Sequence, residues 1–169
     1  YNRVSGYFSS AIFDLAAVQF HDFFAAGGKM NLVCSPCLRS EDASAIISEK
    51  DSYMLDHQLL LTTLKDPSAR DSSQVLCYLI AAEMVEVQIA ELENGELMHE
   101  KIGIFESNSE AVSFTGSINE TRKGWSEQGN KESFDVFLSW SNERDDERVN
   151  NHKARFHKYW TDNVIGTSV

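Results

Sequence analysis

The sequence predicts a single α/β domain built on a mixed β-sheet flanked by helices. Residues 4–8 form a short β-branched and aromatic run, 9–28 carry apolar residues at helical spacing, and 29–35 are a continuous apolar run. This strand–helix–strand order is typical of a right-handed crossover between parallel strands. From residue 85 the apolar period changes to two, which indicates antiparallel strands in the same domain. A chain of 169 residues fits one domain over residues 1–169.

Each further element follows from its own apolar pattern. Helical patterns and their caps predict additional helices at 40–50, 52–64, 72–84 and 142–164. Alternating patterns predict strands at 85–92, 97–106, 111–117 and 132–140. Asn94–Gly95 stands between the first two of these strands and predicts a hairpin that joins them. In the last helix we expect four side chains to face the core: Val149, Phe156, Tyr159 and Trp160.

Composition narrows the function classes. The net charge of −11 disfavours broad, sequence-independent binding to nucleic acid, although basic residues gather at 122–123, 131 and 153–158. Three cysteines favour a reducing compartment, and we expect a cytoplasmic protein. No apolar run reaches the roughly 20 residues that cross a bilayer, so no membrane partner is expected. The chain opens on Tyr1, and we expect it to be a fragment of a longer protein.

His99 and Lys101 interrupt an apolar strand in the stretch "ELMHEKIGIFE". Because side chains alternate along a strand, His99 and Lys101 share a face with Gly103, whereas Met98, Glu100, Ile102 and Ile104 share the other. A neutral imidazole can attack an electrophile, and an ammonium group can hold an anionic oxygen. The pair therefore suits a phosphate ester.

Two later clusters extend this chemistry. Ser117 and Asn119 follow Gly116 at a strand end, where they can donate hydrogen bonds to an oxyanion or simply shape a turn. Asn130 and Glu132 begin another strand, and a carboxylate there can orient an imidazole by accepting its proton. The other histidines have no lysine two residues on, so we interpret them as surface or structural groups. "CSPC" at 34–37 lacks a second pair of zinc ligands, so no metal is expected.

His99-x-Lys101, an acid after four further residues, and Gly-Ser-x-Asn at 116–119 resemble the signature of the phospholipase D superfamily. The segment 3–36 and "GSINETRKGW" followed by "NKE" are similar to the phospholipase D-like nuclease domains at the N-terminus of superfamily II helicases and in restriction enzymes. The resemblance covers most of the chain. It departs from the family at Glu106, where an aspartate is usual, and in the longer gap between Glu106 and Gly116.

The resemblance implies a phosphodiesterase that needs neither metal nor cofactor. His99 would form a phosphohistidine intermediate, and Glu132 would orient the His99 ring. The phosphate oxygens would be bound by Lys101, Ser117 and Asn119. Substrate contacts are expected from Arg122, Lys123 and Asn130, and a supporting or structural role from Glu106. Such enzymes use a second histidine, and this chain has one copy of the motif. We therefore expect a homodimer with a composite active site.

The expected substrate is nucleic acid, DNA rather than RNA, and the expected context is a module of a restriction or repair helicase. Two alternatives stay open. The first is a catalytically silent DNA-binding or dimerisation module of a helicase, for which the changed acid and the negative charge leave room. The second is a lipid phosphatidyl transferase, which the absence of an apolar anchor disfavours.

Overall fold

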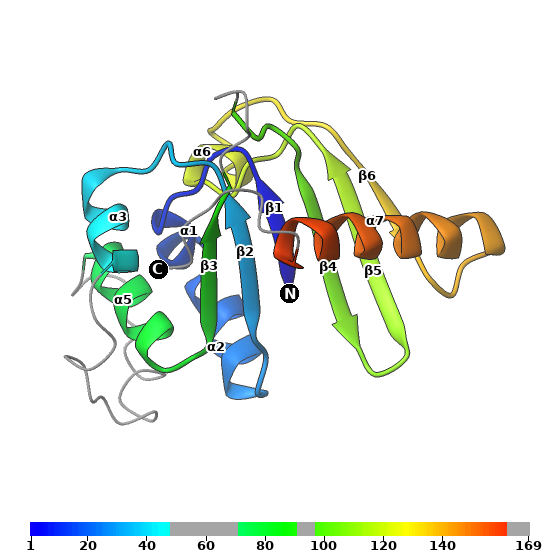
Figure 1. The fold of residues 1–169 in the computed structure, drawn as a ribbon, viewed down its shortest axis with the longest axis horizontal. Helices are drawn as coiled ribbons and strands as arrows, with labels where there is room; N and C mark the ends of the chain where they lie inside the picture. The colour runs from blue at the N-terminus through cyan, green and yellow to red at the C-terminus, as the bar shows by residue number, and fades with distance from the viewer. Residues whose placement is uncertain (48–70, 91–96, 162–169) are drawn as a thin grey trace.

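A computed structural model describes residues 1–47, 71–90 and 97–161 (Figure 1). Its strands are β1 (Asn2–Ser5), β2 (Met30–Cys34), β3 (Val85–Ile89), β4 (Ile102–Ser107), β5 (Glu110–Gly116) and β6 (Phe134–Leu138). Its helices are α1 (Ala11–Leu15), α2 (Ala17–Ala25), α3 (Ser40–Ile47), α5 (Ser72–Ala81), α6 (Arg122–Trp125) and α7 (Glu143–Thr161). The helix expected at 52–64 lies outside the described residues.

The strands form one mixed sheet in the order β3-β2-β1-β4-β5-β6. β1, β2 and β3 are parallel, as the crossover pattern predicts, and β4, β5 and β6 run antiparallel to their neighbours. The predicted hairpin between β3 and β4 is wrong, because β2 and β1 lie between them in the sheet. The alternation marks both segments as strands but does not specify their partners, and β4 pairs with β1. Asn94 and Gly95 themselves lie outside the described residues.

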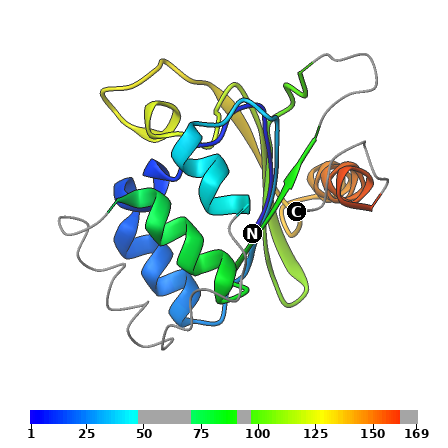
Figure 2. The ribbon, with the colours of Figure 1, turned by 60° about the vertical axis from the view of Figure 1, so that its left-hand side comes forward.

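Helices cover the two faces of the sheet unequally. α1, α2, α3 and α5 lie on one face, over β1, β2 and β3, and α7 crosses the other face (Figures 1 and 2). The first core joins the helices to Met30, Leu32 and Val85. The second core lies under α7 and contains Val4, Val33, Ala90, Met98, Ile102, Ile104 and Phe156, with Tyr159 and Trp160 packed against it. Phe156, Tyr159 and Trp160 thus meet the core as predicted, and Val149 is also buried.

Local backbone features explain where predicted and observed elements differ. The helix expected at 9–28 is broken into α1 and α2 at Ala16, whose φ of −118° and ψ of 38° are not helical. Gly27, with φ of +82°, adopts the left-handed conformation that ends α2. The single turn of α6 is too short for periodicity to reveal. Thr121 caps its N-terminus, where the Thr121 side chain accepts a hydrogen bond from the Gly124 amide.

Candidate active site

One edge of the sheet gathers the residues with candidate chemistry. β1 ends there, β4 and β6 begin there, and β5 ends there, at the top of Figure 1. The register places Ile102 opposite Thr115 and Gly116 opposite Phe134. The residues that immediately precede β4 and β6 and follow β5 are therefore neighbours in space. They include His99, Lys101, Ser117 and Glu132.

His99 and Lys101 approach each other at the end of β1. A Cβ atom placed on Gly6 would lie 3.2 Å from Nζ of Lys101 and 3.3 Å from Cδ2 of His99. The Lys101 ammonium also donates a hydrogen bond to the carbonyl oxygen of His99, 2.6 Å away. Both side chains thus reach one spot beside Gly6, as the shared-face prediction requires. The absence of a side chain at Gly6 lets His99 and Lys101 approach this closely, a role that sequence reasoning missed.

Met98, Ile102 and Ile104 pack into the core under α7, and Glu100 pairs there with Arg155. The opposite face of the segment therefore holds the residues that alternation assigned to it. His99 and Lys101 themselves precede β4 rather than lie within it. The alternation nevertheless continues through them, which is why the prediction of their direction holds.

The Lys101 ammonium is shielded from water, whereas the His99 ring is open to it. Lys101 is 6% exposed, and His99 is an exposed residue. Burial lowers the pKa of Lys101, the nearby Arg3 lowers it further, and Glu132 acts in the opposite direction. The ring of Tyr7 lies edge-on to the His99 ring, with 6.2 Å between their centroids. A partly desolvated cation beside an exposed imidazole can hold an anion while the imidazole reaches it.

Gly116 allows β5 and β6 to approach closely at the site. A Cβ atom on Gly116 would overlap the carbonyl oxygen of Ser133 and lie 2.6 Å from Cα of Phe134. Beyond this contact, Ser117 donates its amide to the Ser133 carbonyl oxygen, 2.9 Å away, and accepts the Ser133 amide on Oγ at 3.1 Å. The glycine before Ser117 is therefore required by backbone proximity.

Glu132 lies within the same cluster. Its carboxylate accepts the Ser117 hydroxyl and, at 3.1 Å, the side-chain amide of Asn130. The hydrogen bonds that the structure gives Glu132 do not include one to His99, so its expected role in orienting the imidazole stays a prediction. The structure does bring Ser117, Asn130 and Glu132 together, as the sequence predicts.

Asn119 and Glu120 attach the Gly-Ser-x-Asn loop to the segment that follows β1. Oδ1 of Asn119 accepts the Tyr7 amide at 3.0 Å. The Glu120 amide donates to Oγ of Ser5 at 2.8 Å, and the Glu120 carbonyl oxygen accepts the Ser9 amide at 3.0 Å. The loop is therefore held from both sides, with Asn119 facing the residue next to Gly6.

A buried ion pair supports this loop from below. Arg3 is 0% and Glu120 2% exposed, and their Nε and Oε2 atoms are 2.7 Å apart. The same carboxylate oxygen accepts the Tyr1 hydroxyl at 3.1 Å and the Trp125 indole N–H at 3.3 Å. Sequence reasoning missed this network. The available signals were an arginine inside the apolar stretch "NRVSGYF" and the acid directly after Asn119.

The remaining predicted residues lie further out. Glu106 is near the other end of β4, roughly 16 Å along the strand from Lys101, and it contacts Lys153 at 2.8 Å and Asn2 at 2.8 Å. It therefore fastens α7 to the sheet, which agrees with the structural half of its expected role. The structure does not place Glu106 beside His99 in a supporting position, because β4 runs away from the site.

Arg122 and Lys123 are exposed on α6, which packs against α1 on the face opposite α7. Burial raises the pKa of Asp14 in α1, and the Arg122 guanidinium opposes that rise, so Arg122 lies toward α1. The Lys123 carbonyl oxygen accepts the Asn130 amide at 2.8 Å. α6 thus shapes the loop that carries Asn130.

Comparison with known protein families finds a match over most of the chain. The family described as "Cardiolipin synthase, PLD-like domain" matches residues 25–160, a span that includes His99, Lys101, Ser117, Asn119 and Glu132. No curated protein matches the chain. In the part of the chain that the structure describes, none of the helices is long and apolar enough to span a membrane. Within the same residues, no group of three or more histidine, cysteine or acidic side chains is placed to hold a metal ion.

Proposed function

We propose, from the premise that this chain belongs to the PLD-like domain family, that it hydrolyses phosphodiester bonds in nucleic acid. Membership of the family implies phosphodiester chemistry at the level of the superfamily, and the choice of nucleic acid is our proposal. The observation that carries it is the close approach of the Lys101 ammonium and the His99 side chain beside Gly6. Ser117, Asn119 and Glu132 lie on the neighbouring strand ends.

The chemistry that this arrangement supports has two steps. In the first, a ring nitrogen of His99 attacks phosphorus, a P–N bond forms, and the bond from phosphorus to the leaving oxygen breaks. Lys101, Ser117 and Asn119 hold the non-bridging oxygens, whose negative charge they stabilise. In the second, water attacks the phosphohistidine, the P–N bond breaks, and His99 is regenerated. Neither step requires a metal ion.

A second proton-transfer group completes the reaction, since the leaving oxygen must gain a proton and the attacking water must lose one. The motif occurs once in this chain. We therefore propose a two-fold homodimer in which two copies of His99 meet at one composite site. The exposure of His99 at the rim of the sheet leaves it accessible to a second copy.

Nucleic acid is favoured over lipid by the resemblance of two stretches to the nuclease branch, the segment 3–36 and the "GSINETRKGW" to "NKE" region. The same resemblance supports a module attached to a restriction or repair helicase, acting on DNA rather than RNA in the cytoplasm. The family description names cardiolipin synthase, so phosphatidyl transfer is kept as an outcome of the test below.

The test compares the chain with its His99→Ala variant on DNA, RNA, a small chromogenic phosphodiester and phosphatidylglycerol vesicles, all in EDTA. We expect DNA cleavage that His99→Ala abolishes, and acid-labile phosphate on the unsubstituted protein trapped during turnover. DNA binding without cleavage, equal in both proteins, would replace the nuclease by a silent binding module. Release of a lipid head group alone would replace it by a phosphatidyl transferase.

The dimer has its own test. Activity per chain should fall on dilution in parallel with the dimer fraction measured by sedimentation. Mixing inactive His99→Ala with active chains should also lower activity more than dilution alone does. A monomer that retains full activity at high dilution would contradict the composite site.

A further inference from the structure

A row of positive side chains runs along one flank of α7. Arg144, Arg148, Arg155 and Lys158 recur at spacings that place them on one side of a helix with 3.6 residues per turn, together with Asn151 and His152. All four cations are exposed. We call this set the cationic flank. The acidic residues of α7 lie at angular positions outside it, although the chain as a whole carries a charge of −11.

The charges of the cationic flank are mostly unneutralised. Arg155 pairs with Glu100. Among the ion pairs between residues 1–47, 71–90 and 97–161, none involves Arg144, Arg148 or Lys158. By contrast, Lys153 on the other flank of α7 is paired with Glu106. Unpaired cations gathered on an acidic body mark a local site for an anion.

The shape of the cationic flank suits an extended ligand. A shallow hollow of about 470 Å³ runs along it, lined by Arg148, Asn151, His152, Ala154, Arg155 and Lys158. The 14 steps from Arg144 to Lys158 span ~21 Å at 1.5 Å per residue. That length corresponds to roughly six steps of a nucleic-acid strand at 3.4 Å per charge.

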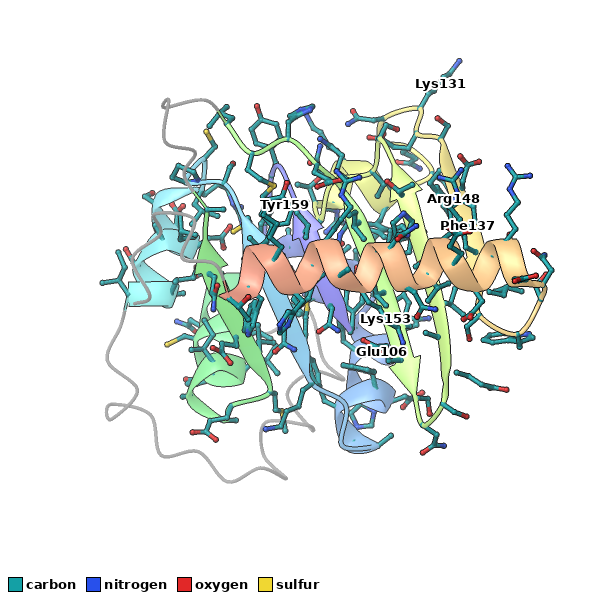
Figure 3. All side chains as sticks on the ribbon, turned by 45° about the vertical axis from the view of Figure 1, so that its right-hand side comes forward. Glu106, Lys131, Phe137, Arg148, Lys153 and Tyr159 are labelled. Carbon is teal, nitrogen blue, oxygen red and sulfur yellow. The ribbon has the colours of Figure 1, made fainter. Side chains whose placement is uncertain are left out.

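The cationic flank also leads to the candidate active site. Its member Arg155 pairs with Glu100, the residue after His99. In Figure 3, Arg148 and Tyr159 lie on the side of α7 that faces Lys131, which precedes β6 in the chain, whereas Lys153 and Glu106 lie on the other side. A polymer held along this flank would reach the site edge without crossing the sheet.

We propose that the cationic flank holds the phosphate backbone of a nucleic-acid strand on its way to His99. This inference rests on the proposed function, since it assigns the surface by which that site receives a polymeric substrate. Phosphates contact Arg144, Arg148 and Lys158, and the side chains of Asn151 and His152 line the floor. Contacts of this kind are independent of base sequence and weaken with salt.

The test compares two double variants, each of which removes two positive charges. One removes them from the cationic flank, and the other removes them from positions outside it. Arg148→Gln with Lys158→Gln alters the flank. Lys29→Gln with Lys153→Gln is the matched control, since Lys29 is exposed before β2 and Lys153 is on the other flank. Binding of a fluorescent single strand of roughly 20 nucleotides, which is longer than the flank requires, is measured by anisotropy on the His99→Ala background.

We expect the flank variant to bind about tenfold more weakly and its salt slope to fall by about 1.4, ~0.7 for each lost contact with a single strand. The control should change affinity by less than about twofold, because two charges away from the path act only through the net field. Equal losses in the two variants, or no loss in the flank variant, would overturn the inference.

The same variants with His99 intact separate this inference from the proposed function. The small chromogenic phosphodiester is too short to extend from His99 to the flank. The flank variant should therefore hydrolyse it at an unchanged rate and lose only DNA cleavage. If the unsubstituted chain binds DNA through the flank but hydrolyses nothing, the catalytic proposal fails and the binding surface stands. If it hydrolyses the small diester but binds DNA without using the flank, the binding surface fails and the catalytic proposal stands.

Discussion

The rim of the site and the layer beneath it each centre on a glutamate, but the two carboxylates lie in opposite environments. At the rim, Glu132 contacts Ser117 and Asn130 on the surface. One layer down, Glu120 is 2% exposed and is held by Arg3, Tyr1 and Trp125. Water screens the rim carboxylate, whereas the buried one depends on its partners. Substitutions at the rim should therefore change rate, and those beneath it should change stability first.

Glu120→Ala should have the largest effect, because it leaves the fully buried Arg3 guanidinium without its counter-ion. Breaking such a pair costs about 3–5 kcal/mol, which we expect as a loss in the free energy of unfolding measured with urea. Activity should be lost with the fold. Arg3→Met combined with Glu120→Leu is the control, and it should recover most of the stability. A stable Glu120→Ala protein would show that the layer does not support the rim.

Glu132→Gln should separate rate from stability. The amide keeps the size of the side chain but removes the charge that faces Ser117 and Lys101, and we expect activity to fall by about 10²–10³-fold. The free energy of unfolding should change by less than about 0.5 kcal/mol, as for other surface substitutions. Steady-state hydrolysis and urea unfolding measure the two quantities. A variant as active as the unsubstituted chain would remove Glu132 from the chemistry.

The lowered pKa of Lys101 predicts an alkaline limit to activity. Lys101 must be protonated to hold an anionic oxygen, so kcat/KM should fall as the pH rises through its pKa. Since burial lowers that pKa from 10.5, the limb should appear at a lower pH than for an exposed lysine. Lys101→Arg is the comparison, since a guanidinium stays charged throughout this range. An identical limb in Lys101→Arg would assign it to another group.

Glu106→Gln should have the smallest effect. Its contact with Lys153 is partly exposed at both ends, with side chains 39% and 35% accessible, and such pairs contribute up to about 1 kcal/mol. We expect a small decrease in the urea midpoint and unchanged activity. A double-mutant cycle with Lys153→Gln isolates the pair. A large loss of activity in Glu106→Gln would instead place this acid in the catalytic chemistry.

Local patterns in the sequence were sufficient to predict the mixed sheet, the parallel crossover and the α7 core. Each of these depends on apolar residues that recur every two or every 3.6 residues. They also predicted the direction of His99 and Lys101. The partner of β4 could not be predicted, since alternation fits any antiparallel neighbour. The Arg3–Glu120 pair joins residues 117 positions apart, and no local signal states such a contact. Glu106 is close to Lys101 in the sequence, but β4 carries it away from the candidate site, and the sequence does not show the direction of that strand.

That separation of 117 positions also bears on when the site can exist during synthesis. β1 is synthesised well before β4, in which Ile102 pairs with Val4, and before Glu120, which lies 117 positions after Arg3. Contacts of such high sequence separation form slowly, because the loop must be closed before they stabilise anything. Until Glu120 has been synthesised, Arg3 has no counter-ion and the layer beneath the candidate site is incomplete. The candidate site would therefore be complete only after the whole segment from Arg3 to Glu132 has been synthesised.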